Sequence, residues 1–175
     1  LVHAAAGGVG QLLVQTAKQM GAMVLGTVGS EAKAQIAQEL GCDHVILYKE
    51  ERVLDKVMEI TNGEGLTIVY DSVGKDTFHD SLASLAPMGH LVNFGQSSGP
   101  IEGFELPMLA KKSSTLSRPM LFHNTHDRNQ LLKMSISLFD SILGGKLQAR
   151  PAIQLGLGEA AKAHEMLAAR KTSQP

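Results

Sequence analysis

The sequence predicts an α/β protein with a doubly wound parallel sheet of six strands and helices on both of its faces. One observation is the unit at the start of the chain, where an apolar strand-like run, a glycine-rich turn, a helical pattern over residues 11–20 and a second strand over residues 24–28 follow one another. These pieces fit into roughly 30 residues, the size of a βαβ unit. A second observation is the near-continuous apolar run over residues 66–71, which is typical of a strand covered on both faces.

The turn after the first strand has the spacing Ala5-x-Gly7-x-x-Gly10, a dinucleotide-binding fingerprint with alanine in place of the first glycine. Ala5 permits the tight turn, Gly7 lets the backbone approach a pyrophosphate, and Gly10 lets the helix pack against the strand. The fingerprint makes the predicted fold Rossmann-type, although an ordinary glycine-rich turn is the alternative interpretation. Because a helix start attracts anions, the candidate pyrophosphate site comprises Ala6, Gly7, Gly8, Val9 and Gly10.

The end of the second strand bears on the choice of cofactor. An NAD-specific site places an acidic residue there to bind the ribose 2′-hydroxyl group. This strand ends instead in Gly29 and Ser30, with Lys33 one helical turn later and Ser30 as a candidate N-cap. These residues suit a 2′-phosphate, so the sequence favours NADP(H), with Glu31 as the feature that argues against it. Lys33 can also be read as an ordinary solvated lysine.

The strand–helix alternation continues through the rest of the chain. Pro87 is expected to close a helix, and Arg118 and Pro119 to mark the exit of the sixth strand, because proline cannot donate to a ladder. Strands are expected over residues 44–48, 66–71, 90–95 and from Ser113 to Leu121, and helices over about residues 52–60, 78–85, 127–143 and 158–170.

Further candidate site residues follow the predicted strands, since ligands of open parallel sheets bind outside the carboxyl ends of the strands. Tyr48 can lie against an adenine or reach a phosphate, or it can be an ordinary half-buried strand tyrosine. Asp71 also lies at this edge, but a turn-capping role explains it equally well. The remaining candidates on the cofactor side are Ser72, Gly74, Phe94, Gly95 and Gln96.

Composition excludes several classes of protein. With 17 acidic and 16 basic residues, the chain carries no electrostatic signature of a nucleic-acid or membrane partner. The single Cys42 excludes an intrachain disulfide and indicates a reducing, cytoplasmic compartment. No apolar run reaches the ~20 residues of a membrane span. The chain starts inside a strand and stops without an obvious final element, as we expect of an excised domain.

The sequence offers no convincing catalytic acid and no metal site. The pair His123-x-x-His126 lacks the partners of a zinc site, and one cysteine cannot form a cluster. Surface or packing roles are the interpretation for His3, His79, His90, His123 and His164.

Taken together, the motifs resemble the zinc-free quinone oxidoreductases, the zeta-crystallin-like branch of the medium-chain dehydrogenase/reductase superfamily. The resemblance covers nearly the whole chain. It rests on the stretches His3-Ala4-Ala5-Ala6-Gly7-Gly8-Val9-Gly10, Gly26-Thr27-Val28-Gly29-Ser30 with Lys33, Tyr70-Asp71-Ser72-Val73-Gly74, Phe94-Gly95-Gln96-Ser97-Ser98-Gly99, Ser117-Arg118-Pro119 and Ala163-His164-Glu165.

The resemblance implies the NADPH-binding domain of a reductase that transfers a hydride from the nicotinamide to a quinone. It assigns the stretch from Ala6 to Gly10 to the pyrophosphate. It assigns the region of Gly29, Ser30, Lys33 and Tyr48 to the 2′-phosphate, and Ser72, Gly74 and the stretch from Phe94 to Gln96 to the ribose and nicotinamide. An NADPH-dependent alkenal or enoyl reductase is the alternative enzyme, and a non-catalytic crystallin-like or RNA-binding protein is the alternative of another class.

The resemblance also implies a domain organisation. Residues 1–147 form the dinucleotide-binding domain, and residues 148–175 lead back towards a GroES-like catalytic domain that this chain lacks. Members of the family form homodimers by pairing their sixth strands, so the strand from Ser113 to Leu121 is the candidate interface. The fragment alone is expected to be inactive.

Overall fold

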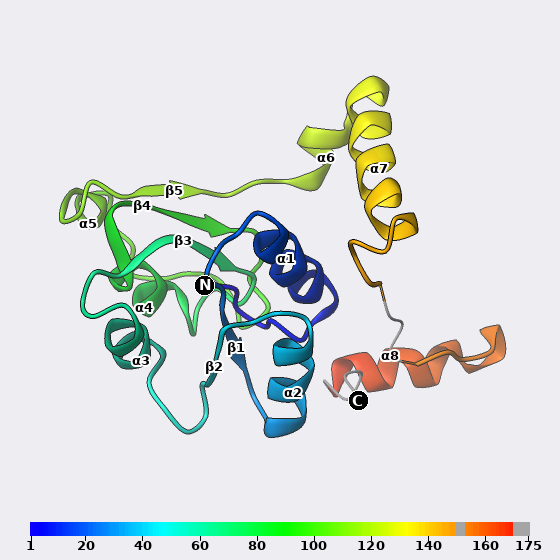
Figure 1. The fold of residues 1–175 in the computed structure, drawn as a ribbon, viewed down its shortest axis with the longest axis horizontal. Helices are drawn as coiled ribbons and strands as arrows, with labels where there is room; N and C mark the ends of the chain where they lie inside the picture. The colour runs from blue at the N-terminus through cyan, green and yellow to red at the C-terminus, as the bar shows by residue number, and fades with distance from the viewer. Residues whose placement is uncertain (150–152, 170–175) are drawn as a thin grey trace.

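The chain folds into alternating helices and strands (Figure 1). The structure is a computed structural model that describes residues 1–149 and 153–169. The strands are β1 (Leu25–Val28), β2 (His44–Leu47), β3 (Leu66–Asp71), β4 (Leu85–Asn93) and β5 (Thr115–Ser117). The helices are α1 (Gly8–Gln19), α2 (Glu31–Glu39), α3 (Val53–Ile60), α4 (Phe78–Ala83), α5 (Pro107–Ala110), α6 (Leu121–Thr125), α7 (Arg128–Leu143), the 3₁₀ turn η1 (Leu157–Glu159) and α8 (Ala160–Ala168).

All strand pairs are parallel, which confirms the α/β prediction, but the predicted six-stranded sheet is wrong. The described residues form a two-stranded sheet, β1–β2, and a three-stranded sheet, β3–β4–β5. The predicted first strand is reduced to Val2, which forms isolated parallel bridges to Gly26 of β1 and Tyr70 of β3. Among the described residues, this short segment joins the two sheets, in the spatial order β2, β1, Val2, β3, β4, β5.

Two other predicted boundaries shift for physical reasons. Strand β4 begins at Leu85, earlier than the predicted residue 90, and its pairing with β3 is irregular between Leu66 and Ile68. This irregularity lies in the part of the pair that contains Pro87, which has no N–H for a ladder. Strand β5 stops at Ser117, and the predicted strand end, Leu121, begins α6 instead.

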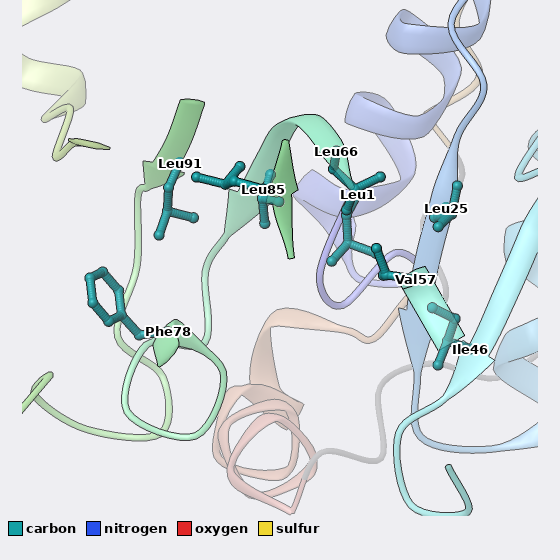
Figure 2. Packing of buried hydrophobic residues seen from close by; sticks show 9 residues of the cluster. Leu1, Leu25, Ile46, Val57, Leu66, Phe78, Leu85 and Leu91 are labelled. Carbon is teal, nitrogen blue, oxygen red and sulfur yellow. The ribbon is translucent and has the colours of Figure 1, made fainter. Parts of the chain in front are cut away.

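Helices pack on both sides of the strands. On one side, Val14 of α1 and Ala34 and Ala37 of α2 pack with Val2 and Val28 in one buried cluster. On the other, Val57 of α3 and Phe78 of α4 join the leucine-rich cluster of the strands, whose side chains Figure 2 shows. Full burial of a valine, leucine or phenylalanine side chain stabilises the fold by about 1.5–3 kcal/mol. The two clusters therefore supply the main stabilisation.

Close packing restricts side-chain size where β1 passes the turn. A Cβ atom on Gly26 would lie 2.7 Å from Ala5 Cβ and 2.7 Å from Cys42 Sγ. Such distances are too short for carbon and sulfur in contact, so glycine is needed where the first turn, β1 and the residues before β2 meet.

The C-terminal third lies mostly outside this core. Figure 1 shows α6 and α7 extending away from the end of β5, and the side chains of α7 remain exposed or half-buried among the described residues. The segment after α7 returns to α1, where Gln15 Nε2 donates to Gln148 O over 3.1 Å and Gln148 N donates to Gln15 Oε1 over 2.7 Å. Leu147 is buried there. The predicted end of the last helix, Arg170, lies outside the described residues.

None of the helices in residues 1–149 and 153–169 is both long and apolar enough to cross a membrane.

Candidate functional site: a cleft at the carboxyl edge of the strands

The glycine-rich turn connects Val2 to α1 through a backbone strained at one residue. Ala4 has φ +52°, a left-handed conformation that alanine rarely adopts. Its carbonyl oxygen accepts a hydrogen bond from Gly7 N over 2.8 Å. A Cβ on Gly10 would lie only 2.2 Å from the same oxygen, so α1 packs on the turn because residue 10 is glycine. Helix geometry leaves the first N–H groups of α1 without intrahelical acceptors, and they lie at this turn.

The second part of the site follows β1 and β2. Ser30 is the N-cap residue of α2, as predicted, yet within the described chain its hydroxyl makes no capping hydrogen bond. The ring of Tyr48 lies against Gly29, where a Cβ would be 2.6 Å from Tyr48 Oη. Glycine at position 29 therefore lets the tyrosine hydroxyl close over the end of β1. Lys33 of α2 is half-buried on the same side.

A cleft of about 560 Å³ joins these parts, and three predicted residues, Gly7, Lys33 and Tyr48, line it. Two more cleft residues that sequence reasoning did not assign, Arg52 and Asp80, form an ion pair with 3.0 Å between Nη2 and Oδ1. The rest of the lining includes His3, Ala4, Thr27, Glu51, Val53, Val73, Asp76, Thr77, Ser97, Ser98 and Leu167.

The loops after β3 and β4 form the neighbouring wall. Asp71, buried at the end of β3, accepts hydrogen bonds from Val73 N (2.8 Å) and Gly74 N (3.0 Å), which confirms the turn-capping interpretation. The Oγ1 of Thr77 donates to Asp71 Oδ1 over 2.9 Å. Ser98 Oγ donates to Val73 O over 2.8 Å and so ties the two loops together.

The other predicted residues lie around the cleft rather than in its lining. Gly95 packs against the backbone of Ser72, since a Cβ on it would be 2.6 Å from Ser72 O. Gln96 lines a separate, smaller cavity of about 290 Å³ beside Phe78 and Phe104. The predicted site residues that do not line the cleft of about 560 Å³ are Ala6, Gly8, Val9, Gly10, Gly29, Ser30, Ser72, Gly74, Phe94, Gly95 and Gln96.

His3 is the residue whose place in the site the sequence did not reveal. Its packing role is confirmed, because the side chain is only 3% exposed. Both ring nitrogens are paired, Nδ1 with Thr27 Oγ1 at 3.0 Å and Nε2 with Ser81 Oγ at 2.9 Å. Burial lowers the pKa of His3 to about 4, so the ring is neutral at pH 7. Its position directly before the glycine-rich turn was the sequence signal for a place in the site. Its hydrogen-bond partners, Thr27 and Ser81, lie far along the chain.

Comparison with known proteins gives the family. Residues 8–137 match the family model described as zinc-binding dehydrogenase. The chain belongs to this family. Its curated relatives include a quinone oxidoreductase of Pseudomonas aeruginosa, 43% identical over 174 residues, and a 2-haloacrylate reductase of a Burkholderia species, 41% identical over 175 residues. The first alignment covers 99% of this chain and 54% of the relative, and the second covers 98% and 52%.

A solved structure extends the likeness to three dimensions. The Escherichia coli quinone oxidoreductase complexed with NADPH matches with a TM-score of 0.87 and 40% identity, over 98% of this chain and 54% of that one. The family resemblance inferred from the motifs is thus confirmed. The chain spans about half the length of the relatives that it matches.

The family name raises the question of zinc, which the described residues do not fit. Residues 1–149 and 153–169 contain no group of three or more histidine, cysteine or acidic side chains that could hold a metal ion. Cys42 is buried, and burial raises its pKa to about 11, so it is a poor thiolate ligand.

A dinucleotide fits the cleft residues better than a zinc ion does. Gly7 brings bare backbone to the cleft lining, and glycine at position 29 makes room for the ring of Tyr48 at the end of β1. Lys33 supplies a cation and Tyr48 a hydroxyl within the same lining.

Proposed function

We propose that this chain is the cofactor domain of an NADPH-dependent quinone oxidoreductase, with the dinucleotide lying across the carboxyl edge of the strands. The observation that carries this proposal is the single cleft of about 560 Å³ that Gly7, Lys33 and Tyr48 line together. A family member of 40% identity has been solved with NADPH, which supports the same cofactor here.

In this proposal the turn and the start of α1 hold the pyrophosphate. Their N–H groups and the positive end of the helix dipole face the anion. Ser30, Lys33 and Tyr48 hold the 2′-phosphate at the end of β1, because a hydroxyl, an ammonium and a phenol all donate to phosphate oxygens. Strand β1 ends at Val28 and is followed by Gly29 and Ser30 without an acidic residue, and Glu31, at the start of α2, is the nearby acid that opposes a 2′-phosphate.

The loops after β3 and β4 orient the other half of the cofactor. Ser72, Gly74, Phe94, Gly95 and Gln96 border the ribose and nicotinamide in this arrangement, and Asp71 fixes the first of these loops. When bound, the nicotinamide supplies the hydride that reduces the quinone. The contribution of this chain is to bind and orient the cofactor, and we assign it no catalytic residue.

The domain organisation is part of the same proposal. Residues 1–147 form the cofactor domain, and residues 148–175 lead towards a GroES-like domain that supplies the substrate pocket. The edge position of β5 supports homodimer formation through this strand, because an edge strand presents unpaired backbone groups to a second copy.

The test is calorimetric titration of the chain with NADPH and with NADH. We expect tighter binding of NADPH, and Lys33→Ala to weaken it about tenfold or more while leaving NADH binding unchanged, since a hydrogen bond to a charged group is worth about 1.5–3 kcal/mol. Lys133→Ala, an exposed lysine of α7, is the matched control. Equal affinities of the wild-type chain for NADPH and NADH would contradict the proposed 2′-phosphate site.

An activated alkene is the alternative substrate, favoured by the relative named 2-haloacrylate reductase, whose identity to this chain is 41%. Turnover of a quinone and of an enone by the full-length protein separates the two. Turnover of neither would favour the non-catalytic, crystallin-like or RNA-binding alternative.

A further inference from the structure

We propose that His3 is a positioning residue for the cofactor turn: through Thr27 Oγ1 it holds Ala4 in the left-handed conformation from which the turn starts. The inference rests on the proposed function in its choice of NADPH as the probe. The turn itself is also tested without the cofactor.

The turn needs such a restraint because its first residue is strained. A non-glycine residue in the left-handed region costs roughly 1–2 kcal/mol relative to ordinary backbone. Ala4 has φ +52°, and its carbonyl oxygen is the atom on which both Gly7 N and the packing of Gly10 depend. If Ala4 left the left-handed conformation, its carbonyl would rotate and α1 would lose its packing contact with the turn.

Thr27 of β1 supplies the restraint. Its hydroxyl oxygen accepts a hydrogen bond from Ala4 N over 3.3 Å, and its backbone oxygen accepts one from Ala5 N over 3.1 Å. The hydroxyl rotates freely unless its own hydrogen is engaged. His3 Nδ1 lies 3.0 Å away, and we assign it as the acceptor that engages this hydrogen, which fixes the tautomer of the ring.

The rest of the network fixes the ring of His3. With Nδ1 as acceptor, the proton lies on Nε2, which donates to Ser81 Oγ over 2.9 Å. The hydroxyl of Ser81 then donates towards Asp71 Oδ2, 3.5 Å away, and this carboxylate also caps the loop after β3. One directed chain of hydrogen bonds therefore runs from the turn at Ala4 to Asp71 beneath the cleft. It requires a neutral His3, in keeping with the pKa that burial lowers.

Two amide substitutions divide the network at His3. His3→Asn keeps an acceptor at the position of Nδ1 and loses the bond to Ser81. His3→Gln keeps a donor at the position of Nε2 and loses the bond to Thr27. We expect His3→Gln to weaken NADPH binding about tenfold, the effect of one hydrogen bond, and His3→Asn to change it by less than about threefold.

Rescue by glycine separates positioning from general damage to the fold. Glycine adopts positive φ without strain. In the Ala4→Gly background, His3→Gln should therefore change the NADPH affinity by less than about threefold relative to Ala4→Gly alone. Equal losses in His3→Gln and His3→Asn, no loss in His3→Gln, or an undiminished loss from His3→Gln in the Ala4→Gly background would each overturn the proposal.

A ligand-free measurement distinguishes this failure from failure of the proposed function. In the absence of cofactor, the Ala4 amide should exchange its hydrogen faster in His3→Gln than in wild type or His3→Asn. If wild type does not bind NADPH, the proposed function fails, and the exchange rates alone decide the role of His3, with equal rates overturning it. If His3→Gln does not fold, the pair Thr27→Val and Thr27→Ser repeats the test, because only valine removes the hydroxyl.

Discussion

Protonation of His3 should account for a large part of the acid sensitivity of this fold. Burial lowers its pKa from 6.5 to about 4 in the folded chain, whereas the unfolded chain retains the ordinary value. Between these two values the unfolded state binds more protons than the folded state, so stability falls as the pH falls. The stability is fully present above pH 6.5 and is lost progressively towards pH 4. A separation of this size corresponds to about 3 kcal/mol at 1.36 kcal/mol per pKa unit.

The measurement is urea unfolding of wild type and His3→Gln at about pH 7 and about pH 4, with the free energy of unfolding extrapolated to water. Wild type should lose about 3 kcal/mol more than His3→Gln across this interval, because only wild type carries the titrating ring. Other acid-sensitive groups are common to both chains and cancel. One of these is Asp43, whose pKa the hydrogen bond from Lys18 lowers. Equal losses in the two chains would refute the assignment to His3.

Three further predictions concern packing and reactivity. Gly10→Ala places a Cβ 2.2 Å from a backbone oxygen and should destabilise the fold by about 3 kcal/mol in urea unfolding, whereas Gly8→Ala, with open space around it, should change stability by less than about 1 kcal/mol. Similar values for both would contradict the packing of α1. The Cys42 thiol, whose pKa burial raises to about 11, should react with iodoacetamide about 100-fold more slowly in the folded chain than in urea, and equal rates would show that it is accessible. Phe78→Ala should lower the free energy of unfolding by about 3–5 kcal/mol and the exposed Phe122→Ala by less than about 0.5 kcal/mol, an ordering that a reversed result would overturn.

The sequence could predict those elements whose signals are local. The apolar run of β3 has the predicted bounds, residues 66–71, because a continuous apolar run is a local signal of a strand. The expected cover on both faces is incomplete, since Thr67 and Ile68 are exposed. Helix α7 begins where predicted, since Asp127 is a side-chain N-cap that accepts hydrogen bonds from Asn129 N and Gln130 N. Gly7, Lys33 and Tyr48 share one cleft because parallel strands bring their carboxyl ends to one edge.

Features that depend on distant partners could not be predicted in the same way. The length of β5 is limited by its pairing with only three residues of β4, and no local pattern announces that limit. The apolar start of the chain was expected to form a full strand, yet only Val2 pairs with both neighbours. His3 acquires its role from Thr27 and Ser81, 24 and 78 residues away, so its function is invisible to spacing rules.

The junction of Ala5, Gly26 and Cys42 constrains how the sequence can change over evolutionary time. A Cβ at position 26 would lie 2.7 Å from atoms of both neighbours, so a larger residue cannot be inherited there as an isolated event. Alanine at position 26 becomes tolerable only after a smaller residue has replaced Cys42 and the turn has given way. In a library randomised at positions 5, 26 and 42, folded variants with a side chain at position 26 should carry smaller residues at positions 5 and 42. Substitutions at this junction should therefore accumulate together, with a change at position 26 accompanied by changes in the residues that contact it.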